Sequence, residues 1–146
     1  MTEVPIYRCK LERAGSLHVP SATIGRTNVA VDALRTLIGD RDREHFAVLY
    51  LDRENLLIGA EITSIGTQDK VQLWVEHVFR GAVVSGCDKL IVAHNHGRAP
   101  ATPSPEDRTL TKELAKCGKL LGLRVVDHIV LAVDGSYYSF HDKRAL

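Results

Sequence analysis

Cysteine is scarce in this sequence: Cys9, Cys87 and Cys117 are its only three, and no two of them form a CxxC pair. Their odd number and wide spacing argue against a disulfide framework and against a cysteine zinc site. We expect free thiols that pack as small, buried apolar side chains. Because such thiols suit a reducing compartment, we expect a cytoplasmic protein.

Long apolar runs and an excess of one charge are lacking too. Runs such as 129–133 are far too short to cross a bilayer, and residues 1–10 contain no apolar stretch of signal-peptide length, so we expect no membrane partner. The 19 Lys and Arg residues nearly balance the 18 Asp and Glu residues, which leaves a net charge of +1. Any nucleic-acid-binding surface therefore has to be local.

What is present is the composition of an ordinary globular domain. The 146 residues are 45% hydrophobic and 25% charged, which is enough for one domain with its own core. Gly15 and Pro20 interrupt the first segment, which lacks a clear periodic pattern. We expect residues 1–25 to form an N-terminal arm or edge strands, and residues 26–146 to form a single domain.

The apolar pattern predicts helices interleaved with strands. Apolar residues recur at helical spacing in three segments that each end at a glycine, namely 28–38, 71–83 and 110–121. Strand patterns form two hairpins and one continuous apolar strand, at 45–51 with 56–65, at 125–133 with 137–140, and at 89–93. This order predicts the α/β class, with a three-layer-like sandwich around a mixed sheet.

Three candidate metal ligands lie in the segment 93–107, AHNHGRAPATPSPED, which follows the continuous apolar strand. His94 and His96 are two residues apart, so on an extended chain their rings point to the same side, with Cα atoms about 6.6 Å apart. Asp107 completes a set of three if the loop folds back. Because catalytic zinc commonly takes three protein ligands and one water, the sequence predicts one Zn²⁺ per chain with a bound water.

The same segment has a second interpretation that needs no metal. Ser104 at the N-cap, Pro105 at the first helical position and Asp107 at N3 form a variant of the capping box. A pair of histidines leaving a buried strand favours the metal, because α/β sheets place their sites there. The zinc deaminase, HExxH, P-loop and GxGxxG motifs are absent, whereas iron or another divalent metal remains open for two histidines and one carboxylate.

The spacing from His94 through Ser104 to Asp107 resembles the HxHx7SxxD signature of the JAMM (JAB/MPN) metalloprotease superfamily. The neighbouring segments EHFAVLYLD, TPSPED, GLRVVDHIVL and DGSYYSF resemble the JAB domain of bacterial RadC-like proteins, and the resemblance covers residues 26–142. It implies a cytidine-deaminase-like α/β fold and a zinc-dependent hydrolase of the JAMM type. The implied reaction is hydrolysis of an amide or isopeptide bond in a peptide substrate.

The resemblance also implies catalytic roles. Glu44, directly before the strand 45–51, would hold and deprotonate the metal-bound water, and Ser104 would donate a hydrogen bond to the oxyanion. Without the resemblance, Glu44 reads as an exposed charge at the start of a strand, and Glu61 on the partner strand competes for the role.

Two departures from RadC-like proteins stand out. Those proteins typically continue HNHPSG, whereas Gly97, Arg98 and Ala99 follow His96 here, so the loop that frames the substrate differs. RadC-like proteins resemble proteins with an N-terminal helical, helix-hairpin-helix-like region, whereas this sequence has only a short arm before the JAB-like segment. We therefore expect that DNA binding by that region does not carry over.

Other polar residues have possible supporting roles. Asp127 and His128 alternate along a strand, so at most one of them faces the site, where it would support a ligand imidazole. Arg98, Arg108 and Lys112 are possible contacts for an anion. Arg108 and Lys112 also belong, with Lys116 and Lys119, to one helix face that is either solvated or a phosphate-binding stripe.

Two other functions stay open from the sequence. A non-catalytic metal-containing module would bind DNA or a protein partner through the basic helix face, in keeping with the DNA-repair association of the RadC name. Glu44 would be of no use to such a module. Nuclease activity at the same metal ranks lowest, because one metal without a charge excess suits phosphodiesters poorly. Hairpin edges could also pair between chains, so an oligomer is possible.

Overall fold

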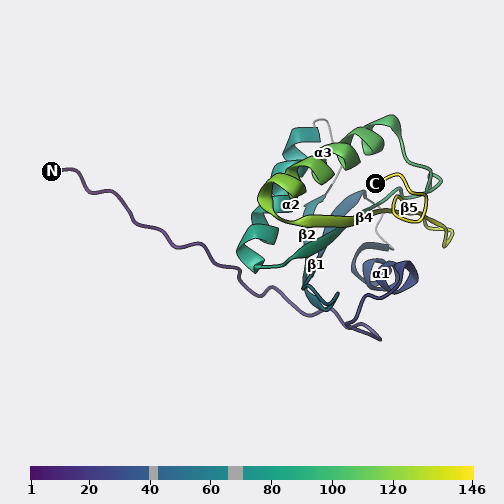
Figure 1. Ribbon diagram of the computed structural model, residues 1–146, viewed down its shortest axis with the longest axis horizontal. Coiled ribbons are helices and arrows are strands. Elements are labelled where there is room, and N and C mark those ends of the chain that lie inside the picture. The colour runs from purple at the N-terminus through teal and green to yellow at the C-terminus, as the bar shows by residue number, and fades with distance from the viewer. Residues whose placement is uncertain (40–42, 66–70) are drawn as a thin grey trace.

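A mixed sheet of five strands runs through the middle of the molecule, as the computed structural model shows for residues 1–39, 43–65 and 71–146 (Figure 1). The strands lie in the order β2-β1-β3-β4-β5, and only β3 and β4 pair in parallel. Their bounds are His45–Leu51 for β1, Leu57–Ile65 for β2, Lys89–Asn95 for β3, Arg124–Leu131 for β4 and Tyr137–Ser139 for β5. The continuous apolar strand of the sequence is thus β3, the central strand.

Helices cover both faces of the sheet. The helix α1 (Thr27–Leu34) continues as a π-helical turn, η1 (Arg35–Gly39), on one face, whereas α2 (Val71–Ser85) and α3 (Pro105–Leu121) cover the other (Figure 1). Successive residues of β1 alternate between the two cores, with Phe46 facing α2 and α3 and Ala47 facing α1. The predicted α/β sandwich with a mixed sheet is confirmed, and it is consistent with a JAB/MPN-type fold.

The helix boundaries follow from local chemistry. Ser104 caps the N-terminus of α3, and Gly122 ends the helix with a φ of 70°, which glycine adopts without strain. Leu110 and Leu114, two of the predicted apolar positions, are buried against the sheet. Because α3 is anchored at both ends, its first turn has a fixed position beside the end of β3.

The first residues of the chain lie outside this core. Residues 1–16 extend away from the domain without helix or strand, and their side chains are exposed (Figure 1). Contact with the domain begins before Thr23, because Val19 packs against the core on the α1 face and the Ala22 carbonyl accepts from the Leu57 N–H at 2.7 Å. Thr23 then forms an isolated bridge with Leu56, and Ile24 is buried. Within the described ranges, no helix combines the length and apolar character that a membrane span requires.

The cysteines are free, as expected, but they are not all buried. Cys87 is buried and Cys117 is half-buried, whereas Cys9 is exposed on the extended N-terminal segment. The prediction of burial is wrong for Cys9 because this segment has no core to pack against.

Candidate metal centre

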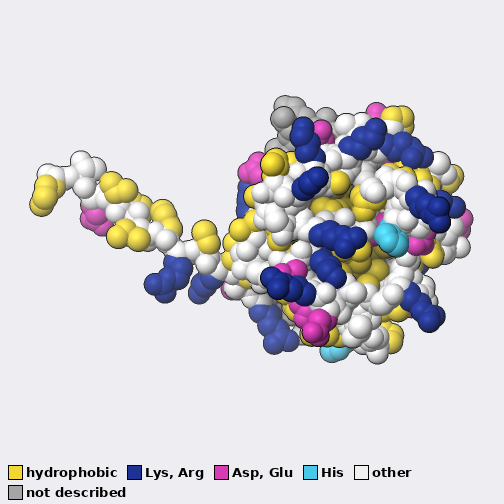
Figure 2. Space-filling view, in the orientation of Figure 1, with side chains coloured by type: hydrophobic (Ala, Val, Ile, Leu, Met, Phe, Trp, Pro, Cys, Tyr) yellow, Lys and Arg dark blue, Asp and Glu magenta, His cyan; other side chains and the backbone are white. Residues whose placement is uncertain are grey.

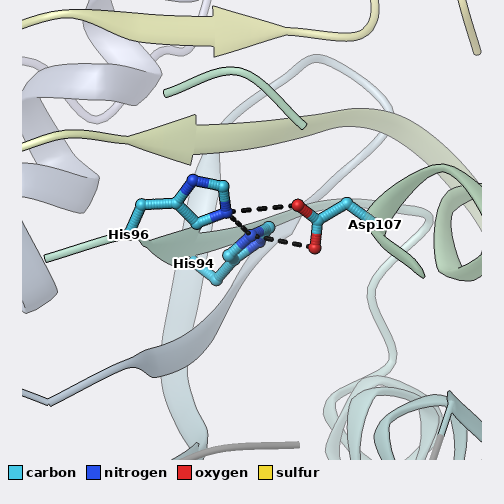
Figure 3. Close-up of side chains that lie close together, drawn as sticks. All are labelled: His94, His96 and Asp107. Atoms are coloured by element: carbon cyan, nitrogen blue, oxygen red, sulfur yellow. Dashed lines mark hydrogen bonds and ion pairs between the residues drawn. The ribbon is translucent and has the colours of Figure 1, made fainter. Parts of the chain in front are cut away.

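The end of β3 delivers the two histidines. His94 pairs in register with Phe46 of β1 and Val130 of β4, so it lies in the middle of the sheet, and its side chain is 1% exposed. His96 follows one residue after β3, and its backbone N–H donates to the carbonyl of Leu131 at 2.8 Å. As the i, i+2 spacing predicts, both rings project toward the N-terminus of α3 (Figure 3).

Asp107 reaches the histidines from the first turn of α3. Its backbone N–H donates to Ser104 Oγ at 3.1 Å, and its Oδ2 accepts from the Ser104 N–H at 2.8 Å. The capping box is therefore present, and the same carboxylate also faces both imidazoles. The two interpretations of this residue coexist because a carboxylate has two oxygens and about four acceptor positions.

The candidate ligand atoms lie close together, with a different oxygen of Asp107 facing each histidine ring (Figure 3). His94 Nε2 lies 3.0 Å from His96 Nε2 and 3.2 Å from Asp107 Oδ1, and His96 Nε2 lies 3.1 Å from Asp107 Oδ2. Tetrahedral zinc with bonds of about 2.05 Å would separate its ligand atoms by about 3.3 Å. The distance between the two histidine nitrogens and the distance from each nitrogen to its carboxylate oxygen are within a few tenths of an ångström of that value, and this His-His-Asp group could hold a metal ion.

A backbone carbonyl fixes the free nitrogen of His96. The ring Nδ1 lies 2.7 Å from the carbonyl oxygen of Pro100, which can only accept, so Nδ1 carries a proton. In the neutral ring, Nε2 then has a lone pair directed at Asp107 and His94. This is the arrangement in which metal-binding histidines are commonly held.

The charges of the site respond to one another. The hydrogen bond with Asp107 raises the pKa of His96, against the effect of burial. Burial alone would raise the pKa of Asp107, but the adjacent His94 and His96 rings lower it well below its usual range. Without a metal, a proton between His96 and the Asp107 carboxylate supplies a positive charge, and this charge stabilises the surrounding hydrogen-bond acceptors.

His128 of β4 contacts the proposed ligand His94, whereas Asp127 does not reach the proposed ligands. His128 is fully buried, its Nε2 lies 2.9 Å from His94 Nδ1, and burial lowers its pKa well below the ordinary value, so the ring is neutral. Asp127 pairs in register with Ile91, which faces α1, and its carboxylate accepts from the Ser139 hydroxyl at 2.5 Å. The structure thus brings only His128 to the ligands, as strand alternation requires.

Sequence reasoning missed Thr111, which lies behind His128. Its Oγ1 is 2.6 Å from His128 Nδ1 and donates to the backbone carbonyl of Asp107 at 2.7 Å. The available signal was its position four residues after Asp107, which places both residues on one face of α3.

Glu44 lies at the start of β1, half-buried and close enough to His96 for its charge to contribute to the raised pKa of that ring. The side-chain amide of Asn95 hydrogen-bonds to the two residues that flank Glu44. Its Nδ2 donates to the carbonyl of Arg43 at 3.0 Å, and its Oδ1 accepts from the His45 N–H at 2.6 Å. Asn95 is a second residue that sequence reasoning missed. It ties the Glu44 backbone to the strand that carries the histidines.

The rival carboxylate, Glu61, is engaged elsewhere. Its Oε2 accepts a hydrogen bond from the hydroxyl of Tyr50, beside Gly81 of α2. Tyr50 is a core residue whose pKa is raised by burial and by Glu61. Glu61 therefore forms part of the packing between the sheet and α2.

The predicted anion contacts are exposed around and beyond the site. Arg98 lies in the turn after His96, and the guanidinium of Arg108 lies 5.8 Å from the ring centre of Tyr138, a cation–π distance. Lys112, Lys116 and Lys119 are exposed along α3. Lys and Arg side chains recur across the face that α3 covers, with apolar side chains and some carboxylates between them (Figure 2).

Comparisons with known proteins agree with this geometry. The family model described as "RadC-like JAB domain" matches residues 24–145. A UPF0758 protein of Actinobacillus pleuropneumoniae serotype 5b is 36% identical over 121 residues, which are 83% of this chain and 54% of the relative. A UPF0758 protein of Picosynechococcus sp. is 38% identical over 106 residues, 73% of this chain and 43% of the relative. The chain thus spans about half the length of the curated relatives it matches.

Proposed function

The chain belongs to the RadC-like JAB domain family, and on this premise we propose that it is a zinc-dependent hydrolase that cleaves an amide or isopeptide bond. The observation that carries the proposal is the cluster of His94, His96 and Asp107, whose nitrogen-to-nitrogen and nitrogen-to-oxygen distances of 3.0 to 3.2 Å are close to the ligand separations of a tetrahedral metal site. Zinc bound there would act as a Lewis acid and lower the pKa of a bound water to about 7.

Glu44 is the proposed general base and acid. Its place directly before β1 puts it near enough to His96 for its charge to act on that ring, while it remains half-buried. It would take a proton from the attacking water and return it to the leaving amine. Asn95 would keep it in place through the hydrogen bonds to Arg43 and His45.

Ser104 can serve the cap and the reaction together. In the capping box its Oγ accepts a hydrogen bond from Asp107, which uses a lone pair of the hydroxyl. The hydroxyl proton stays available for donation to an oxyanion, because one hydroxyl both donates and accepts. We therefore assign Ser104 the stabilisation of the developing negative charge, a contribution of about 2.7 to 4 kcal/mol in comparable sites.

The substrate class follows from the same site. We propose a peptide or another amide, processed in the cytoplasm, with Arg98, Arg108 and Lys112 as contacts for acidic groups on it. A DNA-binding module is the second candidate, favoured by the exposed row of Arg108, Lys112, Lys116 and Lys119 on α3. Salt-dependent DNA binding that is lost on charge reversal of this row would support the second candidate.

Metal content and cleavage test the main proposal together. Purified protein should contain about one zinc per chain, and His96→Ala should remove it. A peptide library incubated with zinc-loaded protein should show new termini by mass spectrometry. Glu44→Gln is the matched control, because it should keep the zinc and abolish cleavage. Absence of zinc from the purified protein, or the same fragments from Glu44→Gln, would contradict the proposal.

A further inference from the structure

A chain of buried hydrogen bonds leads away from His94 on the side opposite the proposed metal. His94 Nδ1 lies 2.9 Å from His128 Nε2, and His128 Nδ1 lies 2.6 Å from Thr111 Oγ1. The Thr111 hydroxyl donates to the carbonyl of Asp107 at 2.7 Å. His94, His128 and Thr111 are each no more than 2% exposed, so solvent has little access to this chain.

The donors and acceptors in this series of hydrogen bonds follow from its last acceptor, the carbonyl of Asp107. A carbonyl oxygen only accepts, so the single hydroxyl proton of Thr111 points to Asp107. Thr111 Oγ1 then accepts from His128, which places the proton of that neutral ring on Nδ1. His128 Nε2 is left as an acceptor for the Nδ1–H of His94, and His94 Nε2 keeps its lone pair.

We propose that Thr111 and His128 are positioning residues that set the tautomer of His94 and so keep its Nε2 unprotonated, with its lone pair available to a metal. This inference rests on the proposed metal site and extends it to residues that touch no substrate. The carbonyl of Pro100 sets the tautomer of His96 in the same way, with the ring proton on Nδ1. Two imidazole lone pairs 3.0 Å apart, facing one carboxylate, repel one another, so a cation between them, either a metal ion or a proton, would stabilise the group.

Packing holds the His128 ring in the orientation that the chain needs. The ring stacks on Phe140, with centroids 5.1 Å apart and an interplanar angle of 9°, and lies 5.9 Å from Phe46 on another side. Thr111 is one helical turn after Asp107, so α3 supplies both a ligand and the group that sets the opposite ligand. The hydrogen-bond chain therefore links two of the three proposed ligands, Asp107 and His94.

Thr111→Val tests the inference, because valine has nearly the shape of threonine and lacks the hydroxyl. Nitrogen-15 NMR of the metal-free protein at alkaline pH should show His94 and His128 protonated on Nδ1 in the wild type. In Thr111→Val, His128 should carry its proton on Nε2, and His94 should follow. Zinc affinity, measured by competition with a chelator, should fall about 10- to 100-fold.

Two further variants separate this role from a structural one. Thr111→Ser restores the hydroxyl and should restore the tautomers and the zinc affinity. Thr109→Val removes a hydroxyl that donates to the carbonyl of Pro105 at 3.1 Å, the same type of bond on the same helix but without a histidine beyond it. It should leave both readouts unchanged.

The inference is overturned if His94 of the wild type is protonated on Nε2 alone. It is also overturned if Thr111→Val folds with unchanged tautomers and zinc affinity. Should Thr111→Val fail to fold, the tautomers of the wild type and of Thr111→Ser still decide. Because the tautomers are read without metal, a wild type that binds no zinc would defeat the proposed function and leave this inference separately tested.

Discussion

Asp107 takes part in two structures at once, the cap of α3 and the candidate metal centre. Its Oδ2 accepts from the Ser104 N–H and lies 3.1 Å from His96 Nε2, while its Oδ1 faces His94. Helix start and ligand position are thereby fixed by one side chain. A change at Asp107 would disturb both, so the two roles have to be separated at neighbouring residues.

Ser104→Ala separates the cap from the metal. The variant loses the Oγ acceptor but keeps the backbone N–H that binds Asp107, so we expect unchanged zinc affinity. The free energy of unfolding should fall by about 1 kcal/mol, as for other lost N-caps, and the cleavage rate should fall about 10²- to 10³-fold. Denaturant titration, zinc titration and the peptide assay measure the three effects. Loss of zinc binding in this variant would contradict the assigned geometry.

The raised pKa of His96 predicts how zinc binding depends on pH. In the metal-free protein, the protonated ring paired with Asp107 stabilises the fold below the ordinary pKa of 6.5, and this contribution is lost as the pH rises through the raised value. Zinc displaces that proton, so the apparent affinity should rise by up to about tenfold per pH unit until the raised pKa is passed. Thermal unfolding should show a smaller shift with zinc at about pH 6 than at about pH 8. A shift that is independent of pH would contradict the assignment.

At the scale of elements, the site depends on where strands and helices end. The end of β3 carries the histidines, the start of β1 carries Glu44, and the first turn of α3 carries Asp107. The β1–β3 pairing sets Phe46 opposite His94, and the side chain of Asn95 joins the two strand ends.

Asn95→Ala tests this junction between strand ends. Removal of the amide leaves the Arg43 carbonyl and the His45 N–H without this partner, which should lower the free energy of unfolding by about 1 to 3 kcal/mol. Zinc should still bind, because none of the three proposed ligands is altered. Cleavage should also fall, because Glu44 loses the support of these two hydrogen bonds. Equal activity of wild type and Asn95→Ala would show that Glu44 needs no such support.

Local patterns predicted most elements and the three candidate ligands, because periodicity, caps and the i, i+2 spacing are local properties. Long-range contacts explain what was missed. The helix predicted over 28–38 widens into η1, where Arg35 donates to the carbonyls of Ala132 and Gly135, 97 and 100 residues away. Thr111 contacts His128 of β4, and Asn95 contacts the backbone of His45 in β1, so these two contacts join different elements and local periodicity does not reveal them.

At the scale of the whole molecule, the domain and the N-terminal segment are different in kind. The domain has cores on both faces of the sheet, whereas residues 1–16 are exposed and bond only among themselves, as in the hydrogen bond from Arg13 to Ser16. The site therefore owes its geometry to the domain alone. The family match, over residues 24–145, begins where burial begins.

Deletion of residues 2–16 tests this division. We expect the free energy of unfolding to stay within about 0.5 kcal/mol of the wild-type value, because no buried contact is removed. Zinc affinity should also be unchanged. Chemical denaturation and zinc titration of the shortened protein give both values. A large loss of stability would show that the arm packs on the domain in solution.

The most direct test of the metal centre is a crystal structure recorded at the zinc absorption edge. One anomalous peak should lie about 2.0 to 2.2 Å from His94 Nε2, His96 Nε2 and a carboxylate oxygen of Asp107, with a solvent molecule in the fourth position. Glu44 should lie within hydrogen-bonding distance of that solvent molecule. A zinc-soaked crystal with no peak between these three residues, or with Asp107 serving only as the helix cap, would contradict the account.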